Sequence, residues 1–206
     1  MKRIYSALWC LSLLIFQTDS NSETYQIGGM YTQHYRDGTY AEWGKYSRIG
    51  AKLALEYINK SNLIWPDTIE MHPENIIDYH CSSENVALMV KSLMEKDIIA
   101  ITGAECSNPA VVMANSGSQF KVPVISYGAN AAELSSSLIY PWFVRVVSPS
   151  ETYEKYLIDL AAFFNIRKIA FIHTSDAWGR GASRVIDEAA KKFNIEVLKK
   201  FSFSRD

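Results

Sequence analysis

The stretch Ile98-Ile-Ala-Ile-Thr-Gly-Ala-Glu-Cys-Ser-Asn-Pro109 decides the fold of this 206-residue chain. It opens with four apolar residues, the pattern of a strand buried in a parallel sheet, and Gly103 then permits a close turn. Asn108 before Pro109 predicts a helix start, with an N-cap side chain and proline at the first helical position. Free N–H groups and the helix dipole then meet the carboxyl end of a strand, where α/β proteins bind polar ligands.

Strand and helix patterns alternate on both sides of this stretch. The helix over 44–60 has apolar residues on one face at the spacing of a core-facing helix, namely Tyr46, Ile49, Leu53, Ala54 and Tyr57. A repeated strand–helix–strand order predicts a parallel, doubly wound α/β sheet. The expected strands are 25–30, 76–81, 98–102 and 122–127, and further helices begin at Ser82 and at Pro109.

The pattern changes at 140–147, which we interpret as an extended segment crossing to a second lobe. Ser148-Pro-Ser-Glu151 predicts a capping box, and the helix that follows carries Tyr153, Leu157, Leu160, Ala161 and Phe164 on one face. A strand at 168–173, a helix at 181–193 and a strand from 195 follow. Two helices and about two strands are too few to close a core on both sheet faces. We therefore expect a first lobe at 23–139, a crossover at 140–149 and a truncated second lobe at 150–206.

The amino end has the pattern of a secretory signal peptide over residues 1–22. Lys2 and Arg3 precede an apolar run over 4–16, and small residues at 18–22 suit cleavage. The alternative is a membrane anchor, but the run is shorter than the roughly 20 residues that span a bilayer. We expect entry into the secretory pathway.

Two cysteines remain once Cys10 is removed with the signal peptide. In an oxidising compartment, Cys81 and Cys106 are expected to form one disulfide, with two free buried thiols as the alternative. If the strands before them are neighbours, both cysteines lie at one sheet edge. Asn59-Lys-Ser61 is an acceptor sequence for N-glycosylation.

Composition and motifs argue against several classes of function. A formal net charge of −1 without a basic stripe gives no support for nucleic-acid binding. No nucleophile elbow, Walker loop or dinucleotide fingerprint occurs, and no histidines and cysteines have metal-ligand spacing. We expect a binding protein without a catalytic residue, metal or cofactor.

Several short motifs, taken in order, resemble those of a known family. They are Gly103–Ser107, Val122–Ala129, Leu134-Ser135, Tyr140–Arg145, Pro149-Ser150 and Asp176–Gly179. Together they resemble the receptor-family ligand-binding region, with the bilobed type I periplasmic-binding-protein or Venus flytrap fold. That family includes ectodomains of class C G-protein-coupled receptors, such as metabotropic glutamate and GABA-B receptors, those of receptor guanylate cyclases, and bacterial amino-acid-binding proteins. The spacing of Cys81 and Cys106 is similar to a disulfide of the animal receptors.

The resemblance implies an extracellular receptor domain that binds a small molecule, an amino acid or a derivative, between two lobes and signals by closure. It also implies a homo- or heterodimer through the first lobe and membrane attachment through a carboxyl-terminal region. The alternative is a soluble secreted or periplasmic solute-binding protein.

The resemblance also points to individual ligand-binding residues. Ser107, next to Asn108, matches a hydroxyl residue that holds an amino-acid carboxylate; the alternative is that Ser107 only caps the helix. Ala129 and Asn130 match a second donor position, where the amino-acid receptors often have Ser or Thr. Because the Ala129 side chain cannot donate, Asn130 or backbone N–H groups would have to.

In the second lobe, Trp178 matches an aromatic residue that closes over the ligand, beside Asp176. An aromatic ring on a strand-to-helix loop can do this by stacking or by a cation–π contact. The alternative for Trp178 is local packing.

Overall fold

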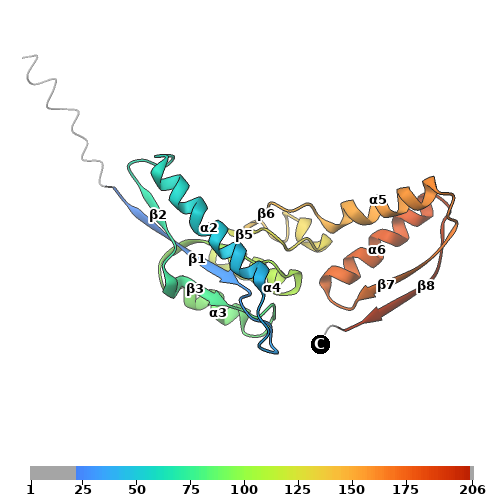
Figure 1. Ribbon diagram of the computed structural model, residues 1–206, viewed down its shortest axis with the longest axis horizontal. Helices are drawn as coiled ribbons and strands as arrows, with labels where there is room; N and C mark the ends of the chain where they lie inside the picture. The colour runs from blue at the N-terminus through green and yellow to red at the C-terminus, as the bar shows by residue number, and fades with distance from the viewer. Residues whose placement is uncertain (1–21, 205–206) are drawn as a thin grey trace, which may run out of the picture.

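The computed structural model describes residues 22–204 (Figure 1). The predicted signal peptide, apart from its last residue, and Cys10 lie outside the described residues. No helix between residues 22 and 204 has the length and the apolar character needed to cross a membrane.

The first lobe is built on a six-stranded sheet whose strand pairs are all parallel. Strand β1 pairs with β4 on one side, and on its other side it pairs with β2 along its first half and with β3 along its second half. The order is β2-β1-β4-β5-β6. The bounds are β1 (Thr24–Tyr31), β2 (Thr68–Glu70), β3 (Ile76–Asp78), β4 (Ile98–Gly103), β5 (Val124–Ser126) and β6 (Phe143–Arg145).

Helices cover both faces of this sheet, which confirms the doubly wound prediction (Figure 1). On one face Ile27 and Tyr31 pack with Leu55 of α2 (Glu42–Lys60). On the other face Met30 and Ile101 pack in the larger core with α3 (Val86–Met94) and α4 (Ser107–Phe120). Short 3-10 turns η1 (Pro73–Asn75) and η2 (Ala132–Ser135) complete the lobe.

The second lobe comprises α5 (Ser150–Phe163), β7 (Lys168–Thr174), α6 (Ala177–Lys192) and β8 (Glu196–Phe203). The two strands are parallel, and a separate small core joins the two helices to them. The α6 stripe predicted from the sequence is confirmed, because Val185, Ile186 and Ala190 are buried.

Several predicted boundaries are wrong. Strand β2 was not predicted, β3 ends at Asp78 rather than at Cys81, and α6 begins at Ala177 rather than at Gly181. The segment expected to cross between lobes contributes β6, which pairs with β5 and extends the first sheet.

The three predicted helix caps are wrong as well. α3 begins after Asn85, and the Ser82 Oγ instead accepts the Glu84 N–H, 3.1 Å away. α4 begins at Ser107, with Cys106 at the N-cap position. α5 begins at Ser150 without a side-chain cap. Ser82 lies in a turn before α3, whereas Asn108 lies within the first turn of α4.

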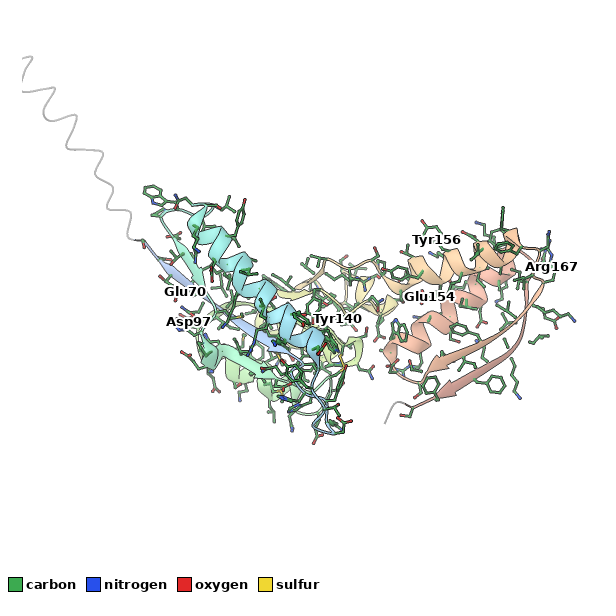
Figure 2. The ribbon with its side chains drawn as sticks, in the orientation of Figure 1. Glu70, Asp97, Tyr140, Glu154, Tyr156 and Arg167 are labelled. Carbon is green, nitrogen blue, oxygen red and sulfur yellow. A yellow bond between two sulfur atoms is a disulfide. The ribbon has the colours of Figure 1, made fainter. Side chains whose placement is uncertain are left out.

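Two predicted apolar faces point to solvent. On α2 the exposed residues are Tyr46, Ile49, Leu53 and Tyr57, and on α5 they are Tyr153, Leu157, Leu160 and Phe164. α2 packs on the sheet through Ala51 and Leu55 instead. On α5, Ser150, Glu154 and Ile158 are the buried residues, whereas Tyr156 points outward (Figure 2).

The Cys81–Cys106 disulfide is confirmed, with Cα atoms 5.6 Å apart. The preceding strands are not neighbours, however, because β1 lies between β3 and β4. The bridge therefore passes over the carboxyl end of β1. His80 and Cys81 adopt positive φ angles of 55° and 53°, which turn the chain back toward Cys106.

The core assignment leads to a paired test on one strand. Ile101 is fully buried in β4, whereas Ile99 is 45% exposed. We expect Ile101→Ala to lower the free energy of unfolding by about 2–5 kcal/mol, because it leaves a cavity. Ile99→Ala is expected to cost much less. Urea unfolding followed by circular dichroism measures both, and equal losses would contradict the assigned core.

Candidate functional site

The start of α4 lies at the carboxyl edge of the first sheet. Its first helical bond runs from the Ala110 N–H to the Cys106 carbonyl, 3.0 Å away. Ser107 and Asn108 precede that bond, so their N–H groups have no intrahelical acceptor, and Pro109 has no N–H. The Ser107 Oγ accepts the Ala131 N–H at 3.2 Å. The ligand-binding role of Ser107 and Asn108 stays a prediction.

The loop after β5 faces this helix start and is organised by Ser126. The buried Ser126 hydroxyl donates to the Ala104 carbonyl at 2.7 Å and accepts the Ala129 N–H at 2.9 Å. Ala129 is buried, so neither its side chain nor its N–H is available to a ligand. Asn130 is half-buried, and its carbonyl accepts the Ser150 N–H at 2.7 Å. The Asn130 amide remains the candidate donor of this loop.

Asp176 and Trp178 lie at the start of α6. The Asp176 Oδ1 accepts the Gly179 N–H at 2.9 Å and the Thr174 hydroxyl at 2.7 Å, so this carboxylate is the N-cap of α6. Trp178, in the first turn, is 36% exposed. The structure thus places Asp176 in a capping position, while the Trp178 ring reaches the surface.

The two helix starts meet. The Asn108 Oδ1 accepts the Ala177 N–H at 2.8 Å, which links the first turns of α4 and α6. Ala177 is buried in the first-lobe core. Gly181 lies so close to η2 that an added Cβ would be 3.4 Å from the Ala132 Cβ. Four predicted site residues, Ser107, Asn108, Asp176 and Trp178, therefore lie at one interlobe junction.

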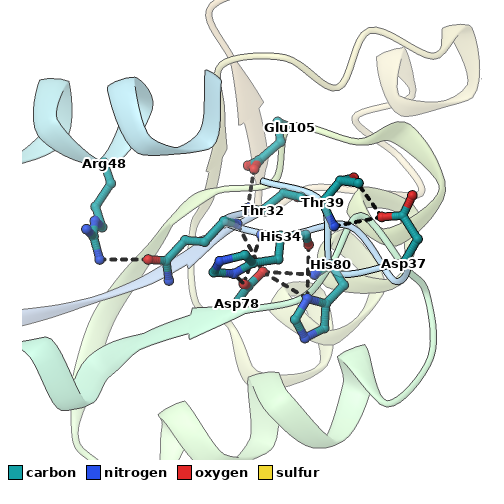
Figure 3. A network of polar contacts seen from close by, with 9 residues as sticks. Thr32, His34, Asp37, Thr39, Arg48, Asp78, His80 and Glu105 are labelled. Carbon is teal, nitrogen blue, oxygen red and sulfur yellow. Dashed lines mark hydrogen bonds and ion pairs between the residues drawn. The ribbon is translucent and has the colours of Figure 1, made fainter. Parts of the chain in front are cut away.

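A buried polar group beneath the α4 start was missed by the sequence reasoning. The Tyr79 hydroxyl accepts the Glu105 and Cys106 N–H groups at 3.1 and 3.2 Å. The Glu105 Oε1 accepts the Thr32 N–H (Figure 3). Burial raises the pKa of Tyr79 well above its ordinary value. An acidic residue directly before the cysteine was the available sequence signal.

Arg145 was also missed as a site residue. From β6 its guanidinium donates to the Ala131 carbonyl at 2.9 Å and to the Ser135 hydroxyl. It is half-buried, and its hydrogen bonds fix the loop after β5. The loop that carries Asn130 is therefore anchored at both ends.

Asp78 fixes the loop between β1 and α2. Its carboxylate accepts the backbone N–H groups of Gln33, His34 and His80 at 3.0–3.1 Å (Figure 3). Burial opposes ionisation, but these donors outweigh it and lower the pKa of Asp78. The loop is thus tied to the turn that carries Cys81.

The arrangement is suited to binding. Within residues 22–204 no three His, Cys, Asp or Glu side chains are grouped so as to hold a metal ion.

Asn59, the predicted glycosylation acceptor, uses its side-chain amide within the fold: Nδ2 donates to the Ile69 carbonyl at 2.9 Å and Oδ1 accepts the Ile69 N–H at 3.1 Å. Glycosylation there stays a prediction.

Residues 47–206 match the family described as the receptor family ligand binding region. The chain belongs to this family. The predicted resemblance and the type I periplasmic-binding-protein-like fold class are confirmed. The chain is 27% identical to Glutamate receptor 3.1 of Oryza sativa subsp. japonica over 161 residues, 78% of its length. It is 24% identical to Metabotropic glutamate receptor 4 of Rattus norvegicus over 213 residues, a match that covers 87% of the present chain.

These matches cover 17% and 23% of the two receptors. A shorter match of 71 residues, 34% identical, covers 34% of this chain and 8% of Metabotropic glutamate receptor 6 of Rattus norvegicus. The chain therefore spans less than a quarter of these relatives and is similar to one region of each.

The Tyr79 hydroxyl offers a matched test. We expect Tyr79→Phe to lower the free energy of unfolding by about 1–3 kcal/mol, because two N–H groups at the α4 start lose their acceptor. Tyr57→Phe makes the same change on a side chain that is 66% exposed, and it should have little effect. Thermal and urea unfolding measure both variants; a Tyr79→Phe protein as stable as wild type would refute this role of the hydroxyl.

Proposed function

We propose that the chain forms the ligand-binding region of a cell-surface receptor, on the extracellular side. Its ligand is a small molecule with a carboxylate, an amino acid or a derivative, bound between the two lobes. Closure of the lobes over the ligand is the signal, because a ligand that contacts both lobes favours the closed state.

The observation that carries this proposal is the convergence of the α4 and α6 starts. Each start places the positive end of a helix dipole at the same junction. The first turn of α4 adds the Ser107 hydroxyl and two N–H groups, the donor set that a carboxylate requires. An anion at this junction would therefore be stabilised by groups of both lobes.

Closure is supported by the contact already present. The Asn108–Ala177 hydrogen bond joins the lobes beside Trp178, so a ligand held at Ser107 lies within reach of α6. The names of the relatives make L-glutamate the first ligand to try. Ala129 provides no hydroxyl at the second donor position, which favours a derivative or a different amino acid as an alternative.

Membrane attachment through a further region and the class of receptor, whether G-protein-coupled or guanylate cyclase, belong to the same proposal. The Cys81–Cys106 disulfide supports an oxidising, extracellular setting. Ile172 of β7 and Phe201 of β8 are largely exposed. Because parallel sheets are covered on both faces, this exposure supports a second lobe with additional elements.

The proposal is tested by L-glutamate binding. We expect Ser107→Ala to weaken the affinity about tenfold or more, because a hydrogen bond to a charged group is lost. Ser118→Ala removes a hydroxyl further along α4 that donates only to the Ala114 carbonyl, and it should bind like wild type. Isothermal titration calorimetry measures the three proteins. Equal affinities for wild type and Ser107→Ala would show that Ser107 does not bind the carboxylate of the ligand.

We also propose that a second copy docks on α2. Its outward face presents four large apolar side chains, of which Tyr46 is 62%, Leu53 59% and Tyr57 66% exposed. A single apolar helix face about three turns long pairs naturally with its own symmetry mate, because a twofold interface uses the same patch twice.

The α2 stripe leads to a test of oligomeric state. We expect wild type to sediment as a dimer and Leu53→Asp to sediment as a monomer, because the charge would be buried at the centre of the interface. Leu138→Asp is the matched control, since Leu138 is 95% exposed on a loop. Sedimentation velocity decides; a Leu53→Asp dimer would mean that another surface joins the copies.

A further inference from the structure

Glu105 lies where the carboxyl ends of β1, β3, β4 and β5 meet. Its side chain reaches the end of β1, where Oε1 accepts the Thr32 N–H (Figure 3). Its backbone N–H donates to the Tyr79 hydroxyl beyond β3. Gly128, beyond β5, packs directly against it, since an added Cβ there would lie 3.2 Å from the Glu105 Cβ. Through its side chain and its backbone, Glu105 thus joins the strand ends next to the start of α4.

The second carboxyl oxygen of Glu105 is buried and has no hydrogen-bond partner among the described residues. The Thr32 and Tyr127 hydroxyls are also buried and unpaired there. None of the ion pairs within residues 22–204 includes Glu105. A buried carboxylate without a counter-ion is costly, and a bound proton removes that cost.

We infer that Glu105 holds a proton in the folded protein and that this proton determines whether the cleft accepts an anion. With the proton on Oε2, the carboxyl group donates to a neighbouring hydroxyl while Oε1 still accepts the Thr32 N–H. Glu105 is therefore a positioning and specificity-determining residue that does not touch the ligand. This inference rests on the proposed function, an anion at the start of α4.

The coupling follows from the position of Glu105, two residues before Ser107. At physiological salt, charges within a Debye length of about 8 Å interact appreciably, more so when one is buried. An ionised Glu105 repels an anion at the α4 start, whereas a neutral one does not. Binding of the proton and binding of the anion are therefore coupled, and each raises the affinity for the other by the same factor.

The tyrosines that face the Glu105 carboxyl carry no charge that would cancel this effect. Tyr31, Tyr79 and Tyr127 come from the ends of β1, β3 and β5, and burial raises all three pKa values, that of Tyr31 to about 12. Arg48 on α2 acts on Tyr31 and donates to Gln33. The phenols stay neutral across the physiological range.

The burial of Glu105 also determines how the stability of the folded protein changes with pH. Burial raises the pKa of Glu105 above its ordinary 4.5, although the Thr32 N–H opposes the shift. The folded state then holds the proton more tightly than the unfolded state. Stability is greatest below the ordinary value and falls as the pH rises through the folded one.

The test compares wild type with Glu105→Gln, which keeps the shape and hydrogen bonds of the protonated acid and cannot ionise. L-glutamate affinity is measured at about pH 5.5 and about pH 8, between which its carboxylates stay ionised. We expect wild type to lose about tenfold in affinity over this interval, within the usual range of site-to-site coupling. Glu105→Gln should keep its low-pH affinity, and the exposed Glu95→Gln should follow wild type. An equal loss in Glu105→Gln would overturn the inference, because the pH dependence would then come from a group other than Glu105.

A ligand-free measurement separates this inference from the proposed function. If no variant binds L-glutamate at either pH, the proposed ligand fails, and urea unfolding decides whether Glu105 holds a proton. We expect wild type to lose stability relative to Glu105→Gln as the pH rises from about 5 to about 8; parallel curves overturn the inference. Should Glu105→Gln not fold, the infrared spectrum of Glu154→Gln replaces it, because Glu154 is the other buried carboxyl with an unpaired oxygen among the described residues. A carboxylic-acid band that persists above pH 5 in this variant supports the proton on Glu105, and its absence overturns the inference.

Discussion

The carboxyl edge of the first sheet depends on how closely Gly103 approaches the end of β1. A Cβ at Gly103 would lie 1.9 Å from the Met30 carbonyl oxygen, and its φ of +120° is one that other residues rarely adopt. The Met30 carbonyl then accepts the Ala104 N–H at 3.1 Å. This close approach places Glu105 against Thr32 and Cys106 against Cys81. The start of α4 takes its position from these contacts.

The alternating strands and helices could be predicted because they follow local periodicity. β4 and the buried stripe of α6 are examples: each has enough apolar residues in phase to bury one side. The short strand β2 could not, because its three residues pair with β1 across a long intervening helix. The α2 stripe had the spacing of a core face, yet α2 packs through Ala51 and Leu55 on the opposite side. Periodicity identifies a face, and only the tertiary contacts decide which face is buried.

The sequence indicated which residues lie at the candidate site but not the hydrogen bonds that they make. The strand-to-helix turn at Cys106 was recognisable from its apolar run followed by Gly103 and Asn108-Pro109. The donor to the Asn108 side chain, however, is the Ala177 N–H, 69 residues away in the second lobe, so no local pattern could show that Asn108 binds the start of α6 instead of capping α4. Glu105 is a similar case. Its role depends on Thr32 and Tyr79, which are brought to it by two other strands.

The two lobes contribute differently to the junction. At the start of α6, the Ala177 N–H is taken by Asn108 and the Gly179 N–H by Asp176. At the start of α4, the Ser107 and Asn108 N–H groups have no acceptor within the helix. An anion therefore finds its hydrogen-bond donors on the first lobe, while the second lobe offers the dipole of α6 and the Trp178 ring. In the proposed mechanism the donors stay on α4 when the lobes separate, so an anion would dock on the first lobe before α6 closes. The charge state of Glu105, which belongs to the first lobe, would then act on docking before it acts on closure.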